Sequence, residues 1–299
     1  MNPLPEIWNT RAESVIRHFV LMDGAMQREL GKALSANRYD GNSLFEGDSP
    51  EAKALGPWLL SAQQAQDAGV DGIARGITWL DGKLELSQAI VHLRSWMIGP
   101  LPDGVARGYL RLGDGRVLRA MLEIWSPNQR AAFLAPWQRI CCADRDGEAW
   151  MTPVLSPAET GSIPRGGVSA RLSDIQYRLL LDSSVPDQLL HELKRHVKPH
   201  SSLSSREQRH VEAVRTLEVA KELGYSATGD WMSLIGGAVR QGKGAAQALR
   251  FHPEVQAGRT GADLWHAVMA DDRWPRWRTG SEDGHESEEH GSTMQEIDG

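Results

Sequence analysis

The segment RGYLRLGDGRVLRAMLEIW, residues 107–125, encodes in succession a strand, a turn and a helix. Residues 107–112 alternate in character, and one face of this predicted strand carries Arg107, Tyr109 and Arg111. After the turn at Gly113-Asp114-Gly115, an apolar stripe repeats at helical spacing, formed by Val117, Leu118, Met121, Leu122 and Trp125. A strand that leads directly into a helix predicts a layered α/β domain.

The same alternation extends to both sides of this segment. Upstream, the pattern predicts strands at residues 18–22, 43–46 and 73–80, the last ended by a turn at Asp81-Gly82, and helices at residues 26–34 and 86–97. Downstream, Ser126-Pro127 is a typical helix start, and residues 137–142 and 148–154 form the two arms of a hairpin. We therefore expect residues 1–154 to form an α/β lobe with a mixed sheet.

The second half of the chain has a different character. Residues 155–170 are rich in proline and glycine and predict a linker, and residues 171–278 show only helical periodicity. The apolar stripes of this predicted all-α lobe are Leu172, Ile175, Leu179 and Leu180; then Leu189, Leu190, Leu193 and Val197; then Val211, Val214, Leu217, Ala220 and Leu223. Residues 279–299 hold seven acidic residues and no lysine or arginine, which predicts a disordered acidic tail.

Charge and cysteine content exclude several classes of protein. The 299 residues carry 33 basic and 39 acidic side chains, a net charge of −6 that is due to the tail. We therefore expect no nucleic-acid partner, because the basic stripe of such proteins is missing. No apolar run approaches the length of a membrane span, and residues 1–15 lack the apolar core of a secretory signal. The only cysteines, Cys141 and Cys142, are adjacent and predict buried, inert thiols, which together with these features favours the cytoplasm.

No motif in the chain completes a catalytic or metal site. Asp23 follows an apolar strand, as the nucleophile of haloacid dehalogenase-type phosphatases does, but Ala25 stands where a second aspartate is needed. His191 and His196 are five residues apart on a helix and point in different directions. Gly242-Lys243-Gly244 lacks the preceding strand and the Ser/Thr of a phosphate-binding loop. We therefore expect a turn-forming Asp23, no metal, no cofactor and no catalytic residue.

Several short motifs, taken in order, resemble a known family. They are Phe19-Val20-Leu21-Met22-Asp23-Gly24-Ala25, Ser43-Leu44-Phe45-Glu46-Gly47, the segment 109–119, Ser126-Pro127-Asn128-Gln129 and Phe133-Leu134-Ala135-Pro136. Their order and spacing over residues 19–138 are similar to a domain of unknown function found in adaptor chaperones of bacterial type VI secretion effectors. The helical second half is similar to the C-terminal lobe that such proteins carry.

The resemblance implies a binding protein and not an enzyme. Such an adaptor binds one cognate effector and helps to load it onto the spike protein of the type VI secretion apparatus, without inserting into a membrane. The residues themselves leave one alternative open, a small-molecule enzyme of α/β type with an unrecognised site.

The residue patterns single out two groups of candidate residues. Asp114 and Arg116 are expected to fix the strand-to-helix turn, with Asp114 as the cap of the following helix. For contacts with the partner, we expect Arg107, Tyr109 and Arg111 from the first lobe and Trp231 and Trp265 from the second. The alternative for each of these five residues is that it packs the two lobes together.

Overall fold

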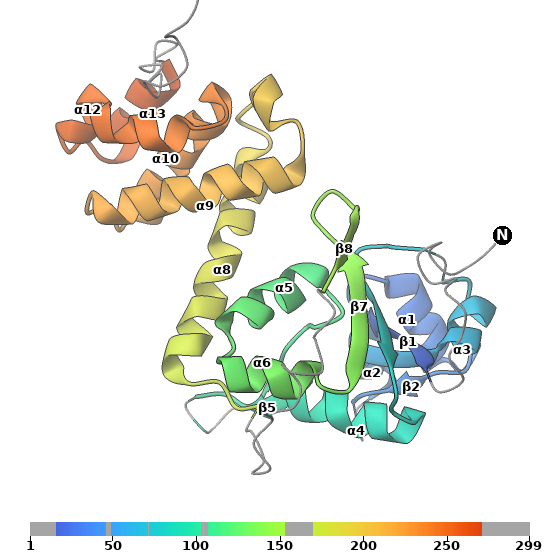
Figure 1. Cartoon of the computed structure of the whole chain (residues 1–299). Helices are drawn as coiled ribbons and strands as arrows, with labels where there is room; N and C mark the ends of the chain where they lie inside the picture. The colour runs from blue at the N-terminus through green and yellow to red at the C-terminus, as the bar shows by residue number, and fades with distance from the viewer. Residues whose placement is uncertain are drawn as a thin grey trace, which may run out of the picture. The chain divides into compact units, whose positions relative to one another are not determined.

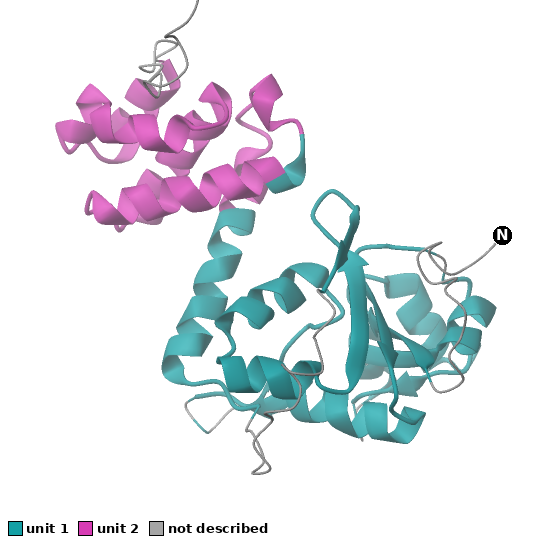
Figure 2. Ribbon diagram, in the orientation of Figure 1, with its two compact units in different colours: residues 1–188, 205–207 teal, residues 189–204, 208–299 magenta. Residues whose placement is uncertain are grey.

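The computed structural model describes residues 16–45, 49–70, 72–102, 104, 107–152 and 170–270. The chain divides into two compact units, shown in two colours in Figure 2: residues 1–188 and 205–207 form unit 1, and residues 189–204 and 208–299 form unit 2. The boundary falls inside helix α8 (Asp174–Leu193), just after Pro186. Except for Ala170, the linker expected at residues 155–170 lies outside the described residues, as does the acidic tail at 279–299.

Unit 1 is built on a six-stranded sheet with the order β2-β3-β1-β4-β7-β8. Its strands are β1 (Arg17–Asp23), β2 (Asn42–Ser43), β3 (Pro57–Ser61), β4 (Ile77–Gly82), β7 (Trp137–Ala143) and β8 (Ala149–Met151). The α/β class of this lobe is confirmed, but every described strand pair is antiparallel, so the mixed sheet was a wrong prediction.

The connection after β1 shows why β1 and β3 are antiparallel. Helices α1 (Arg28–Ser35) and α2 (Pro50–Leu55) pack against each other, and the chain returns to the same end of the strands at which β1 stops. Strand β3 therefore begins at Pro57, directly opposite Asp23, where β1 ends. A single crossover helix would instead have carried the chain to the opposite end of the strands and produced a parallel pair.

Helices cover both faces of this sheet (Figure 1). In the described part of unit 1, the helices besides α1, α2 and α8 are α3 (Ala62–Asp67), α4 (Leu86–Met97), α5 (Gly115–Ile124) and α6 (Pro127–Leu134). Phe19 and Leu21 of β1 pack into a core with residues of α4, α5 and α6, whereas Val20 and Met22 pack on the other face with residues of α1 and α3. A strand buried on both faces is a continuous apolar run, as at residues 19–22.

Two predictions near this sheet are wrong, one on the extent of a strand and one on the place of a turn. The strand expected at residues 107–112 is only β6 (Arg107–Tyr109), which pairs with β5 (Ile98–Pro100) in a separate two-stranded sheet. The turn expected at Asp81-Gly82 is part of β4, where these residues pair with His18 and Arg17 of β1. Pairing with β1 and β7 on both sides keeps the backbone extended there, against the local turn preference of Asp-Gly.

Up to residue 270, where the described residues end, unit 2 is all helical, as expected for the C-terminal half. Its elements after α8 are η2 (Ser201–Leu203), α9 (Arg206–Glu222), α10 (Thr228–Gln241), α11 (Ala245–Ala248), η3 (Leu249–Phe251), α12 (Pro253–Gln256) and α13 (Gly261–Ala270). Its core gathers Val219, Leu234, Leu249 and Leu264 from four of these elements. Among the described residues, no helix combines the length and apolar character that a membrane crossing requires.

Two of the predicted apolar stripes are wrong at several positions. On the α8 stripe, Ile175 and Leu179 are 66% and 48% exposed, while Leu172 and Leu180 pack into the core of unit 1. On α9, Val211 is exposed, as is Leu223 just after the helix, and the buried face includes the polar residues Glu212 and Thr216. The core-facing side of each helix is thus rotated relative to the side that hydrophobicity alone selects.

Candidate functional site

The loop between β6 and α5 holds the turn that the sequence singled out. Asp114 is the N-cap of α5 and accepts a hydrogen bond from the Arg116 backbone N–H at 3.1 Å. The Arg116 guanidinium binds the same carboxylate through Nε at 3.0 Å and Nη2 at 2.7 Å. These hydrogen bonds raise the pKa of Arg116. Asp114 is only 3% exposed, so this pair fixes the start of α5 from inside the protein.

Two glycines allow the loop to approach the sheet. A Cβ at Gly113 would lie 2.9 Å from the Asp23 nitrogen, and one at Gly115 would lie 2.4 Å from the Ala143 carbonyl oxygen. The Thr78 hydroxyl on β4 contacts the carbonyl oxygens of Leu112 and Gly113 at 3.3 Å each. The backbone of the loop is therefore held directly against the ends of β1, β4 and β7.

The side chain of Arg111, in the same loop, forms an ion pair with a buried carboxylate. Asp23 ends β1 with no exposed surface, and Arg111 binds it through Nε at 2.7 Å and Nη2 at 3.0 Å. Asp23 also accepts from the Met26 backbone N–H at 3.1 Å, which is the turn-forming role expected for it. Arg111 lies beyond the end of β6, so the expected single strand face with Arg107 and Tyr109 is wrong.

Tyr109 lies next to this pair and is largely inside the protein. Its ring packs edge-on against Phe45, with centroids 5.1 Å apart, and against the core on the α4–α6 side of the sheet. Its buried hydroxyl has no hydrogen-bond partner among the described residues, and burial together with the Asp23 charge raises the pKa of Tyr109. Of the three expected contact residues in unit 1, Arg107 is the exposed one.

Asp81 forms a second buried ion pair that the sequence did not indicate. This residue is 2% exposed, and Arg139 of β7 binds one carboxylate oxygen through Nη2 at 2.6 Å and Nε at 3.0 Å. His18 of β1 binds the other oxygen through Nδ1. The only local signal was an aspartate beside an apolar strand, which is equally typical of a turn.

Further ion pairs of unit 1 continue outward from Asp114. Asp187 on α8 accepts from Arg145 at 3.0 and 3.2 Å and lies 3.8 Å from Arg116. Arg145 and Arg119 also bind Glu207 at 3.3 and 3.1 Å. The two arginine charges hold the pKa of Glu207 below its usual range, against the effect of its partial burial.

The two tryptophans expected to contact the partner pack within unit 2. Trp231 donates from Nε1 to the Tyr225 carbonyl at 2.9 Å, and its ring lies 5.7 Å from the Lys221 ammonium. Trp265 is half-buried, and its ring would lie 3.4 Å from a Cβ at Gly236 of α10. The structure therefore places Trp231 and Trp265 in one unit and Arg107, Tyr109 and Arg111 in the other.

The glycine-rich loop at residues 242–244 binds a carboxylate of this same chain. Glu212 of α9 is 1% exposed and accepts from the backbone N–H groups of Gly244 at 3.1 Å and Ala246 at 2.8 Å. The Lys243 N–H donates to the Ser202 hydroxyl at 2.9 Å. The loop thus connects helices, as the sequence predicted, and Glu212 satisfies its amides.

The two cysteines lie on opposite faces of β7. Cys141 faces the core beside α1 and α3, and Cys142 faces the core beside α4, α5 and α6. Burial raises the pKa of Cys141 to about 11 and that of Cys142 to about 12. Both thiols are therefore protonated at neutral pH, in agreement with the inert thiols expected from the sequence.

This burial predicts slow thiol labelling in the native protein. At pH 8, a disulfide-exchange reagent such as Ellman's reagent should label neither cysteine on the timescale on which it labels both in guanidinium chloride, because the thiolates form only after unfolding. The absorbance of the released thiolate measures this difference. Rapid labelling of the native protein would contradict the burial of β7.

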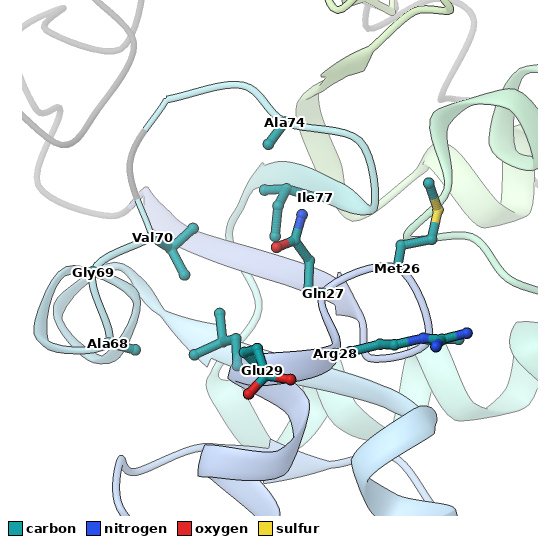
Figure 3. Close-up of a pocket in the computed structure, with 11 residues that line it drawn as sticks. Met26, Gln27, Arg28, Glu29, Ala68, Gly69, Val70, Ala74 and Ile77 are labelled. Atoms are coloured by element: carbon teal, nitrogen blue, oxygen red, sulfur yellow. The ribbon is translucent and has the colours of Figure 1, made fainter.

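A pocket of about 530 Å³ opens beside the start of α1 (Figure 3). Its apolar wall includes Leu30, Val70 and Ile77, and its polar residues are Gln27, Arg28 and Glu29. The Gln27 amide is engaged with the Arg75 carbonyl at 2.7 Å. Among the described residues, no three His, Cys, Asp or Glu side chains lie close enough together to hold a metal ion.

The position of Asp114 predicts a measurable cost for its removal. Asp114→Ala should lower the free energy of unfolding by about 0.5–2 kcal/mol, the range for the loss of an N-cap. Asp114→Asn keeps a capping oxygen and should cost less. Urea unfolding followed by circular dichroism checks both variants. Unchanged stability of Asp114→Ala together with lost partner binding would instead make Asp114 a contact residue.

The comparisons with known proteins concern the region that holds these buried ion pairs. No curated protein and no solved structure matches the chain. One family model does match, over a region that begins in β1, ends within α6 and contains Asp23, Asp81, Arg111 and Asp114. Residues 18–132 are thereby identified as similar to the family described as Domain of unknown function (DUF4123).

Proposed function

We propose that this protein is an adaptor chaperone that binds a cognate type VI secretion effector and helps to load it onto the secretion spike. The observation that carries the proposal is the match of residues 18–132 to the DUF4123 family model. The ordered motifs at residues 19–25, 43–47, 109–119 and 126–136 resemble the effector adaptors in the same region.

The chemistry of unit 1 supports a binding role. The buried carboxylates of Asp23, Asp81 and Asp114 are each bound by an arginine through two nitrogens. Such pairs hold the backbone in place, and they leave these carboxylates engaged and not free for proton transfer. The two buried thiols are protonated at neutral pH and are therefore poor nucleophiles.

The exposed surface of unit 1 offers both charged and apolar contacts. Arg107 is exposed and charged, and Ile175 and Leu179 are adjacent exposed apolar residues on one face of α8. Exposed apolar residues grouped on a helix are typical of protein-binding surfaces. We assign a structural role, and not a contact with the partner, to the four residues that have contacts inside their own units: Tyr109, Arg111, Trp231 and Trp265.

Co-expression with the effector encoded beside this gene tests the proposal. The full chain and the effector should co-purify as a stable complex, whereas an effector from an unrelated cluster should not. Ile175→Asp/Leu179→Asp should weaken the complex, and Asp174→Ala, an exposed change on the same helix, should not. Recovery of the soluble effector without this protein, or turnover of a small molecule by the purified chain, would contradict the adaptor function.

A further inference from the structure

The two edge strands of the six-stranded sheet differ in whether a side chain binds their outward backbone groups. Strand β2 forms one edge, and the carbonyl oxygens of Ser43 and Leu44 accept hydrogen bonds from Arg94, each at 3.0 Å. A side chain of α4 therefore occupies the acceptors at that edge. Proteins commonly cover or charge such edges, because unpaired strand groups bind other strands.

Strand β8 forms the other edge, and no side chain of the described residues binds its outward backbone groups as Arg94 does at β2. The Thr152 N–H donates to the Ile140 carbonyl at 3.0 Å, and the Glu148 carbonyl accepts from the Asp144 N–H at 2.9 Å. Backbone groups alternate in direction along an antiparallel strand, so those of Ala149 and Met151 point away from β7. Among the described residues, none forms a hydrogen bond with these outward groups.

The side chains of β8 leave this edge open to solvent. Ala149 is exposed, Met151 is 43% exposed, and none of the residues 149–151 carries a charge. The Trp150 ring lies on the opposite face of the strand, 5.6 Å from the Arg119 guanidinium, and packs against the core. Trp150 thus anchors the strand while the N–H and C=O groups of its two neighbours are directed outward.

We propose that the β8 edge binds an extended segment of the effector, which adds to the sheet as a further strand. This inference rests on the proposed function for its partner. The backbone of the segment forms hydrogen bonds with the outward groups of Ala149 and Met151. The residue of the segment that lies next to Met151 is uncharged, because the Met151 side chain is apolar.

The size and position of the edge favour the effector over a second copy of this chain. Three residues supply too small a surface to hold a dimer, which needs well over about 1,000 Å² of buried area, so the added strand must belong to a partner that is also held elsewhere. The β7–β8 hairpin lies outside residues 18–132, the region shared with the family. An edge outside the shared region is suited to recognition of one particular effector.

Proline scanning of the edge tests this inference with the full chain and the co-expressed effector. Ala149→Pro and Met151→Pro each remove an outward N–H while keeping the bonds to β7, and prolines are tolerated at such edge positions. Each should weaken effector binding about tenfold, as expected for a lost hydrogen bond and a clashing ring. Met151→Leu keeps both the N–H and an apolar side chain and is the matched control, with a change of less than about threefold. Melting temperatures show whether each variant is folded.

Hydrogen exchange of the wild-type chain provides a second measurement that needs no variant. The amides of Ala149 and Met151 should exchange rapidly in the free protein and become protected in the complex. A wild-type complex in which neither amide gains protection, or which the proline variants form with full affinity, overturns the edge proposal and leaves the adaptor function standing. Protection in the free chain that grows with concentration also overturns it, in favour of a dimer. No complex at all contradicts the adaptor function itself.

Discussion

Replacing Arg111 with methionine should lower the free energy of unfolding of unit 1 by about 3 kcal/mol, the lower end of the range for removing one partner of a buried ion pair, because Asp23 is buried while the Arg111 side chain is 41% exposed. Methionine keeps much of the apolar stem but leaves the Asp23 carboxylate, which has no exposed surface, without its two hydrogen bonds at 2.7 and 3.0 Å. Urea unfolding followed by tryptophan fluorescence measures the loss.

The neighbouring Arg107 offers a matched control for this variant. Arg107 is exposed, so Arg107→Met should change stability by no more than about 0.5 kcal/mol. Asp23→Asn combined with Arg111→Met should recover part of the loss, because a neutral amide is less costly to bury than an unpaired carboxylate. If Arg111→Met is as mild as Arg107→Met, the Asp23–Arg111 pair does not stabilise the fold.

Glu212→Ala should destabilise unit 2 by about 3 kcal/mol or more. The variant removes two charge-assisted hydrogen bonds, to the Gly244 and Ala246 N–H groups, each worth about 1.5–3 kcal/mol. It also leaves the buried Ala246 amide without an acceptor. Hydrogen exchange of amides in α10 and α11 reports the loss in unit 2 directly, because exchange resolves local stability along the chain.

Two variants on α9 separate the role of this carboxylate from that of the helix. Glu218→Ala changes an exposed glutamate on the same helix and should have little effect. Glu212→Gln keeps one acceptor oxygen and should fall between the two alanine variants. Equal protection of α10 and α11 in Glu212→Ala and Glu218→Ala would contradict the structural role of Glu212.

The sequence alone determined those features that depend on neighbouring residues. The apolar run at residues 18–22 predicted a strand, and β1 covers these residues between β3 and β4. Ser126-Pro127 predicted the start of α6, where Ser126 and Gln129 form a complete capping box. Asp114 holds the cap position that its place in the turn suggested. In each case the responsible hydrogen bond or contact spans only a few residues.

The tertiary structure alone decided which polar residues are buried and how the strands pair. Asp23 binds a partner 88 residues away, Asp81 one 58 residues away and Glu212 one 34 residues away. Hydrophobic periodicity assigns such residues to turns or to solvent, since it contains no information on distant partners. The antiparallel pairing of β1 with β3 likewise follows from the packing of α1 against α2, and the exposure of Ile175 and Leu179 follows from the side on which α8 meets its core. The desolvation cost of a buried charge is offset only when a distant opposite charge or amide is brought to it, and folding is what brings them together.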